Sequence, residues 1–198
     1  MVMTTVKSPR RRAKQERAQA TVSAVVEAAA RVLLDEGYAR ATTNRIADAA
    51  GVSVGTLYQY FSSKDEIFDA LIHREIAALE STLLIATPDP KQSLAEGLRV
   101  LLQEIIRARP DTPSLYRALE HVPNALLRRR LGQARGRVVT FIRDILRTRR
   151  GLRVRDLDTA AFLIVAATEG VAMNATKEFF RGNGVDELAS MLARYLER

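Results

Sequence analysis

Residues 41–68 of the chain combine hydroxyl, amide and cationic side chains at spacings that suit contact with nucleic acid. Hydroxyl and amide groups can hydrogen-bond to base edges in a major groove, and tyrosine hydroxyls and cations can reach phosphates. The best candidates for base contact are Thr56 and Gln59. The full candidate set for DNA contact in this stretch is Thr43, Arg45, Ser53, Gly55, Thr56, Tyr58, Gln59, Tyr60 and Lys64.

Roles within this set are expected to differ. The absence of a side chain at Gly55 would let the backbone approach DNA closely. Phosphate contacts are expected from Thr43, Tyr58, Tyr60 and Lys64, whereas Arg45 could contact a base or a phosphate.

Two short helices must position these side chains. Thr42 and Thr43 suit the start of the first helix, whose inner face carries Ile46, Ala47 and Ala50. Gly51 can adopt a positive φ at the turn. Ser53 can cap a second helix over about residues 54–60, in which Leu57 and Phe61, four residues apart, share the buried side. This pattern predicts a helix-turn-helix.

A third helix begins directly afterwards. Ser63 and Glu66 form the pattern of a capping box, and apolar residues continue to about residue 86, before Pro88 and Pro90. The sequence therefore predicts one uninterrupted helix that leads from the helix-turn-helix into the remainder of the chain.

Upstream, residues 19–36 have apolar positions that step by three and four, and Gly37 ends the pattern. The segment before them is basic, and its centre is Arg10, Arg11 and Arg12. We expect a flexible arm over residues 1–18 that adds phosphate or minor-groove contacts.

The stretch TTNRIADAAGVSVGTLYQYFSSKDEIF, the preceding helix that ends in Gly37 and Tyr38, and the basic arm together resemble the tetracycline-repressor (TetR) family of bacterial regulators. The resemblance is close over residues 19–72. It implies an all-α chain with a three-helix DNA-binding domain at residues 19–68 and a helical effector-binding and dimerisation domain at residues 69–198. It also implies a homodimeric repressor that a small molecule releases from DNA.

Composition is consistent with that assignment. The chain has 198 residues, 47% of them hydrophobic, and a formal charge of +8, which favours a polyanionic partner. Without cysteine, and with His73 and His121 far apart, neither a disulfide nor a zinc site is expected. No secretory signal or run of 18 apolar residues occurs, so we expect a soluble cytoplasmic protein. We also expect no cofactor and no metal.

The pattern of the C-terminal part predicts further helices. In total we expect about nine helices in the chain and no strand. Within a helix expected over about 156–180, residues 159–176 are apolar on most sides, so we expect burial on nearly all of them. The simplest arrangement packs it, with the helix at about 124–149, against a second copy as a four-helix interface. Two recognition helices would then lie roughly 34 Å or somewhat more apart on a palindromic operator.

A pocket for a hydrophobic or aromatic effector is expected among these helices. The candidate residues are Leu102, Ile106, Tyr116, Leu119, Glu120, Phe141, Phe162 and Glu169. Alternatives remain open for several of them. Glu169 and Asn174 need polar partners in an apolar helix, either at a helix junction, at the dimer interface or on a ligand. The short segment with Tyr116, Glu120 and His121 could form a pocket mouth or only a connector.

Residues 117–155 contain twelve arginines and two acidic residues. The segment could attract an acidic ligand, nucleic acid or a partner, or its arginines could simply be solvated. No constellation of catalytic residues stands out, so an enzyme is not expected. The alternative function is a chromosome-organising or adaptor protein that uses the same DNA-binding dimer without an effector.

Overall fold

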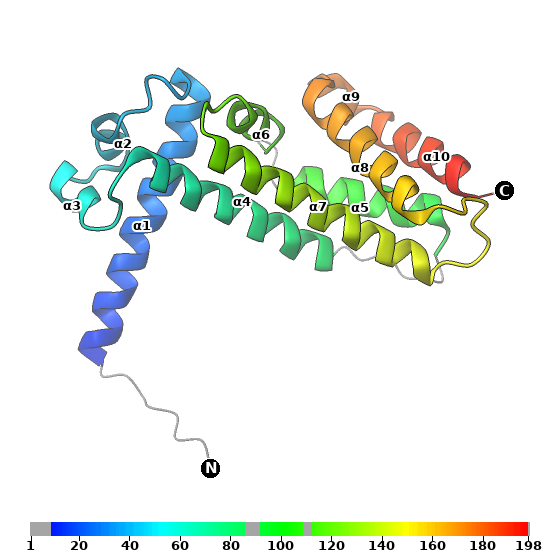
Figure 1. Cartoon of the computed structure of the whole chain (residues 1–198), viewed down its shortest axis with the longest axis horizontal. Coiled ribbons are helices and arrows are strands. Elements are labelled where there is room, and N and C mark those ends of the chain that lie inside the picture. Colours follow the sequence, from blue (N-terminus) through cyan, green and yellow to red (C-terminus); the bar gives the residue numbers. More distant parts are fainter. Residues whose placement is uncertain (1–8, 86–91, 109–111, 198) are drawn as a thin grey trace, which may run out of the picture. The chain divides into compact units, whose positions relative to one another are not determined.

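The computed structural model describes residues 9–85, 92–108 and 112–197, and within them the side chains of all but residues 9–12, 105–108, 112, 113 and 177. These residues form ten helices (Figure 1). Their bounds are α1 Pro9–Glu36, α2 Thr43–Ala50, α3 Val54–Tyr58, α4 Lys64–Ile85, α5 Leu94–Ala108, α6 Thr112–Glu120, α7 Ala125–Thr148, α8 Leu157–Asn174, α9 Lys177–Arg181 and α10 Gly184–Leu196.

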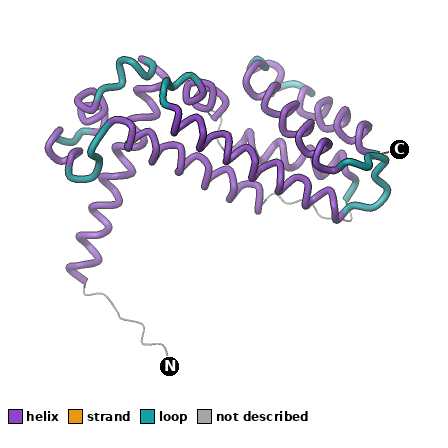
Figure 2. The backbone as a smooth tube through the Cα atoms, viewed as in Figure 1, coloured by secondary structure: helices purple, strands orange, loops and turns teal. Residues whose placement is uncertain are grey.

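The all-α class predicted from the sequence is confirmed. Across the described ranges the backbone is helical or irregular, as Figure 2 shows, and the extended pairing is a single bridge between Leu152 and Glu197. The chain divides into two compact units, Met1–His73 and Arg74–Arg198. The division falls inside α4, which is continuous from Lys64 to Ile85.

The first unit is built around the packing of α1 against α2. The helix α1 buries Val25, Ala29 and Leu33, and Ile46 and Leu57 are fully buried on α2 and α3. Gly37 follows α1 with φ of 79°, a left-handed conformation that glycine adopts without strain. These apolar contacts fix the position of α2 and α3.

The start of α1 differs from the expectation. The helix begins at Pro9, so residues 9–18 are helical and are not a flexible arm; residues 1–8 lie outside the described residues. The physical reason is helix propensity. Arginine, lysine, glutamine and alanine are all good helix formers, and proline is favoured in the first turn. The polar residues of this segment cannot form an apolar core, but they can extend the helix that the apolar residues after them begin.

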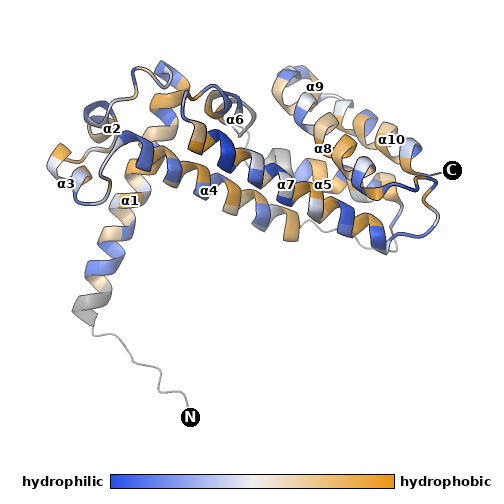
Figure 3. Cartoon of the chain, viewed as in Figure 1, coloured by the Kyte–Doolittle hydropathy of each residue, from blue (hydrophilic) through white to orange (hydrophobic). Residues whose placement is uncertain are grey.

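An apolar core joins five helices of the second unit. The helices α7 and α8 lie side by side, and α10 packs against α5 (Figure 1). The core residues come from α4, α5, α7, α8 and α10, and the largest include Leu98, Leu101, Leu146, Leu192 and Leu196. Figure 3, which colours the ribbon by hydropathy, shows hydrophobic and hydrophilic residues alternating along these helices.

The segment 156–180 is not one helix. It breaks after Asn174, because Ala175 and Thr176 have extended backbones with ψ of 148° and 168°, and α9 follows as a separate short helix. This break raises the number of helices from the expected nine to ten. The burial of α8 within one chain is also lower than expected, since Phe162 is 50% exposed and Leu163 is 43% exposed.

Candidate nucleic-acid interface

The caps of α2 and α3 fix the helix-turn-helix geometry. The Thr42 hydroxyl accepts a hydrogen bond from the backbone N–H of Arg45 at 3.2 Å, and the Ser53 hydroxyl accepts one from Thr56 at 3.0 Å. Between the helices Gly51 has φ of 69° and ψ of 29°, and its N–H bonds to carbonyls at the end of α2. Each cap satisfies backbone donors or acceptors that a short helix leaves free.

Two pairs of hydroxyls lie on the exposed side of these helices. The hydroxyls of Thr43 on α2 and Tyr58 on α3 are 3.1 Å apart, and those of Ser53 and Thr56 are 2.8 Å apart. Tyr58 is 51% exposed. The Thr43–Tyr58 contact therefore brings two residues expected to hold phosphate to one point on the surface. Because one hydroxyl donates to the other, the second hydroxyl keeps its hydrogen for an oxygen acceptor outside the chain.

The outward face of α3 has the expected composition. Gly55, Tyr58 and Gln59 are exposed, and Thr56 and Tyr60 are partly exposed. Leu57 and Phe61 are buried, with 0% and 5% exposure, as their spacing predicts. A Cβ added at Gly55 would come within 3.8 Å of the Ser53 hydroxyl, which is an ordinary contact. The chain itself therefore leaves room for a side chain at position 55.

Arg45 has an acidic neighbour that the sequence did not reveal. Its Nε donates to Glu36 Oε1 at 2.7 Å, which joins the end of α1 to α2. The Arg45 side chain is still 48% exposed. Arg45 is thus accessible, but contact with DNA would compete with this ion pair.

Lys64 takes part in an internal cluster. Its Nζ donates to the Tyr38 carbonyl oxygen at 2.9 Å and lies 3.9 Å from the centroid of the Tyr38 ring. The Tyr38 hydroxyl donates to Asp65, and the ring of Tyr38 lies against Phe68 with centroids 5.0 Å apart. Burial, followed by the hydrogen bond to Asp65, raises the pKa of Tyr38, so this hydroxyl stays protonated as a donor. Lys64 is therefore a structural residue whatever it contributes to DNA contact.

The start of α4 has a modified capping box. The Ser63 hydroxyl accepts from the N–H of Glu66 at 3.2 Å, as predicted. The Glu66 carboxylate returns to Ser62 rather than Ser63, and accepts from its N–H at 2.6 Å and its hydroxyl at 2.8 Å. The Ser62 N–H and hydroxyl lower the pKa of Glu66. The side chains of Arg10, Arg11 and Arg12 lie outside the described residues, so their DNA contact stays a prediction.

Family models match both units of the chain. Residues 25–71 match the model for bacterial regulatory proteins of the tetR family, and residues 93–196 match the tetracyclin repressor-like C-terminal domain. The chain belongs to the TetR family. Membership implies DNA binding and dimerisation, and makes the protein a DNA-binding transcriptional regulator.

Three relatives illustrate the sequence and structural similarity of this TetR-family chain to other proteins. The nucleoid occlusion factor SlmA of Actinobacillus pleuropneumoniae serotype 5b is 35% identical over 60% of this chain, which spans 56% of the relative's length. SlmA of Vibrio vulnificus strain YJ016 is 30% identical over 75% of this chain and 77% of the relative. A TetR-like regulator from Rhodococcus sp. RHA1 has 26% identity and a TM-score of 0.66, with 88% of this chain and 92% of that chain covered.

Apart from Leu119, the described side chains expected to line an effector pocket in this TetR-family protein fall into two groups. Leu102 belongs to the main core of the second unit, and Phe141 packs against that core. Leu119 is buried elsewhere, at 1% exposure. Tyr116, Glu120, Phe162 and Glu169 form the second group, described below, and the side chain of Ile106 lies outside the described residues.

Arg135 of α7 joins the second group, and the sequence reasoning missed it. Its Nη2 lies 2.9 Å from Glu169 Oε2, and its guanidinium carbon is 5.4 Å from the centroid of the Phe162 ring. Within the described part of the chain its buried Nε has no hydrogen-bond partner. The need of Glu169 for a partner in an apolar helix was the available signal. The sequence left a helix junction, the dimer interface and a ligand open as sources of that partner, and the spacing could not identify which of the twelve arginines of residues 117–155 would pair with Glu169.

The electrostatics of this group follow from partial burial. Burial, followed by the charges of Glu169 and Glu120, raises the pKa of Tyr116 to about 12 against the opposing charge of Arg135. Burial also raises the pKa of Glu169, and Arg135 partly offsets that effect. Asn174 donates from Nδ2 to the Gly170 carbonyl at 2.8 Å. Glu169 and Asn174 thus both have polar partners inside their own chain.

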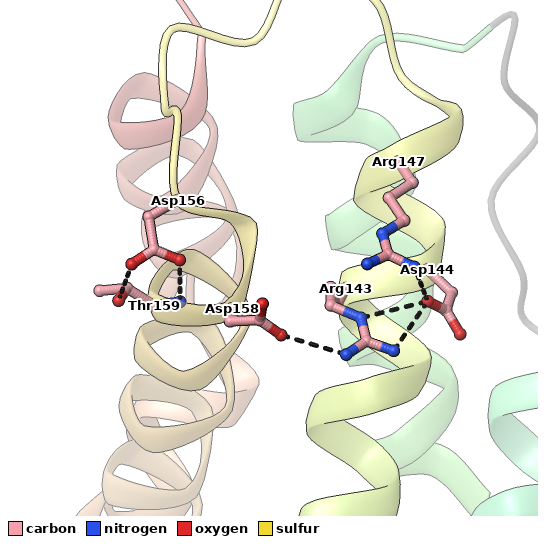
Figure 4. A network of polar contacts seen from close by, with 6 residues as sticks. All are labelled: Arg143, Asp144, Arg147, Asp156, Asp158 and Thr159. Atoms are coloured by element: carbon pink, nitrogen blue, oxygen red, sulfur yellow. Dashed lines mark hydrogen bonds and ion pairs between the residues drawn. The ribbon is translucent and has the colours of Figure 1, made fainter.

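Many arginines of the segment 117–155 also have intrachain partners. Figure 4 shows Arg143 bound to Asp158 across α7 and α8 at 3.1 Å and to Asp144 on its own helix at 3.2 Å. Arg137 pairs with Glu80 of α4 at 2.6 Å. These contacts show that part of the arginine excess holds α7 to its neighbours, which reduces the charge available for an external acidic partner.

Proposed function

We propose that this TetR-family protein is a homodimeric repressor that binds a palindromic operator and leaves it when a small effector binds. The paired hydroxyls on α2 and α3 carry the proposal, because they gather Thr43, Tyr58, Ser53 and Thr56 on one exposed surface. Small polar groups at that position suit a major groove, where Thr56 and Gln59 would read base edges. Thr43, Tyr58, Tyr60 and Lys64 would position phosphates, and Arg45 could do so after release from Glu36.

The α8 surface supports the dimer. The helix has a mean hydropathy of 1.2, yet only 22% of it is buried within the chain. Phe162, Leu163 and Gly170 are exposed on this helix. By length and composition α8 could also cross a membrane, which is weak evidence beside the DNA-binding family. We propose that a second copy covers this surface and that the protein is cytoplasmic.

Glycines on α7 support the same interface. Gly132 and Gly136 are exposed, and a Cβ built at either, or at Gly170 of α8, would meet no atom within 4 Å. Glycine inside a helix is unfavourable by about 1 kcal/mol relative to alanine, so these positions need a reason outside the single chain. Close approach of a second pair of helices would supply one. The proposed interface therefore uses α7 and α8, within the predicted segments 124–149 and 156–180.

The effector is proposed to be hydrophobic or aromatic. The group formed by Tyr116, Phe162 and Glu169 around Arg135 offers rings, a phenol and a guanidinium N–H without a partner among the described residues. Apolar surface with a few polar groups is the usual lining of a small-molecule site. Binding would release DNA only if it favoured a dimer whose recognition helices do not match the operator.

The first experiment is selection of bound duplexes from a random DNA library at near-physiological salt. The expected result is an enriched palindrome whose half-sites lie about one helical turn or slightly more apart. The Gln59→Ala variant should keep binding but lose preference at one position in each half-site, whereas Arg194→Ala, on α10, should enrich the wild-type motif. Failure of the wild-type protein to enrich any motif, with binding that disappears as salt rises, would refute sequence-specific regulation.

A second candidate is a chromosome-organising protein that binds DNA without an effector. The observation that favours it is the similarity to nucleoid occlusion factors at 30–35% identity. Genome-wide mapping of bound sites separates the candidates. A few sites close to promoters, lost on addition of an effector, support the repressor. Many dispersed sites that no compound affects support the organising protein.

A further inference from the structure

A hollow on the first unit has the chemistry of an anion site. It has a volume of about 460 Å³ and is lined by Ala13, Lys14, Arg17, Ala18, Thr21 and Tyr60. Five of these residues lie on α1, and the sixth lies in the turn between α3 and α4. The first unit therefore brings two cations and a phenol together from segments about forty residues apart in the sequence.

The lining residues of α1 form one face of the helix. Their positions step by three and four, so neighbours on that face have Cβ atoms about 5–6 Å apart. Lys14 and Arg17 are exposed and three residues apart, which lets both reach a single group in the hollow. Ala13 and Ala18 are small, and this keeps the space between the cations and Tyr60 open.

Both cations are available for a ligand. Within the described residues no hydrogen bond or ion pair engages the side chain of Lys14 or Arg17; the Arg17 backbone carbonyl accepts from the Thr21 hydroxyl at 3.0 Å. By comparison, Arg45 is held by Glu36 and Lys64 by Tyr38. The two cations at the hollow thus differ from Arg45 and Lys64, which have internal partners.

We propose that this hollow holds one phosphodiester group of the DNA backbone, bound by Lys14, Arg17 and the Tyr60 hydroxyl. The inference rests on the proposed DNA-binding function and deepens it, because it gives the expected phosphate contact of residues 1–18 a defined place, in which Lys14 and Arg17 on α1 act together with Tyr60. Its consequence is that α1, helical from Pro9, is itself part of the DNA surface. One strand of the duplex passes over α1 at the side of the α3–α4 turn.

The test combines protein variants with chemically modified operators and measures DNA binding for each combination. The Lys14→Gln/Arg17→Gln double variant should bind the selected operator about tenfold more weakly than the wild-type protein, because it loses charge-assisted contacts. The salt slope of binding should fall by about 0.9 for each phosphate no longer neutralised. Tyr60→Phe should weaken binding less. Arg194→Gln, which removes one positive charge from an exposed position on α10, should leave affinity and slope close to the wild-type values.

Operators with a single neutral methylphosphonate then identify the phosphate. At one position in each half-site the substitution should weaken wild-type binding and have no effect on the double variant. Equal losses for both proteins at every position would overturn the proposal, as would wild-type affinity of the double variant. A third outcome would also overturn the proposal: inorganic phosphate stabilises the wild-type protein but not the double variant, and no methylphosphonate position distinguishes the two proteins. The hollow would then be a site for a free anion and not for DNA. If wild-type protein binds no DNA, the proposed function itself fails.

Discussion

Replacement of Lys64 by methionine separates the internal contact with Tyr38, which the structure shows, from the phosphate contact that we propose. Methionine keeps most of the apolar stem but removes the ammonium group. The variant therefore loses the hydrogen bond to the Tyr38 carbonyl and the position over the Tyr38 ring. A cation–π contact is worth about 0.5–2 kcal/mol and a hydrogen bond from a charged donor about 1.5–3 kcal/mol. Because both involve one partly exposed group, we expect a combined loss of about 2 kcal/mol.

Loss of that size should not unfold the protein. Domains are typically stable by about 5–15 kcal/mol, and about 3 kcal/mol of remaining stability keeps more than about 99% of molecules folded. Any change in DNA binding by Lys64→Met then reports on the contact and not on unfolding. If Lys64 also neutralises one phosphate, the salt slope should fall by about 0.9 per protomer.

Two measurements check this expectation. Urea unfolding gives the change in stability, and titration of labelled operator at several salt concentrations gives the slope. Arg194→Met is the matched control, because it removes an exposed positive charge on α10 whose partner among the described residues is the Ser190 carbonyl of its own helix. Unchanged urea stability would refute the internal contact with Tyr38. A lower stability with an unchanged slope would show that Lys64 acts on structure alone.

Three further predictions concern other contacts. Glu36→Gln should free Arg45 and strengthen operator binding by up to about fivefold per protomer, since an exposed ion pair is worth at most about 1 kcal/mol. The control Glu96→Gln removes a like charge from an ion pair on α5 and should leave operator binding unchanged. Weaker operator binding by Glu36→Gln would contradict this prediction. Sedimentation should show that Gly170→Trp is monomeric while Gly170→Ala remains dimeric; a dimeric tryptophan variant would place the interface elsewhere. The pKa of Glu169 is raised above its usual 4.5, mainly by burial, so the folded state binds this proton more tightly than the unfolded state. The stability of the wild-type protein relative to Glu169→Gln should therefore decrease as pH rises from about 4.5 through the raised pKa, and a pH-independent difference in urea unfolding would contradict this.

The caps, the turn and the buried residues of the helix-turn-helix could be predicted from the sequence. The caps at Thr42 and Ser53, the left-handed turn at Gly51 and the buried pair Leu57 and Phe61 all depend on neighbours within a few residues. Such features are set by hydrogen-bond geometry and helical spacing, which a single sequence displays directly.

Contacts between distant segments were not readable. Arg45 lies nine residues from Glu36 and Lys64 lies 26 residues from Tyr38, so no helical spacing links them. Both bonds arise because the end of α1 is placed beside α2 and α4 by the apolar core. The same limit applies to the α1 hollow, in which Tyr60 meets Lys14 and Arg17 only after folding.

The polar residues of α8 change the basis for the two proposals about the second unit. From the sequence, Glu169 and Asn174 required partners, and a ligand or a second copy could have supplied them. The structure gives both of them partners in the same chain, Arg135 and the Gly170 carbonyl. Their placement in an apolar helix is therefore no argument for either. The dimer rests instead on the exposed apolar face of α8, and the effector on the Arg135 Nε, a buried donor whose hydrogen-bonding capacity is unused among the described residues.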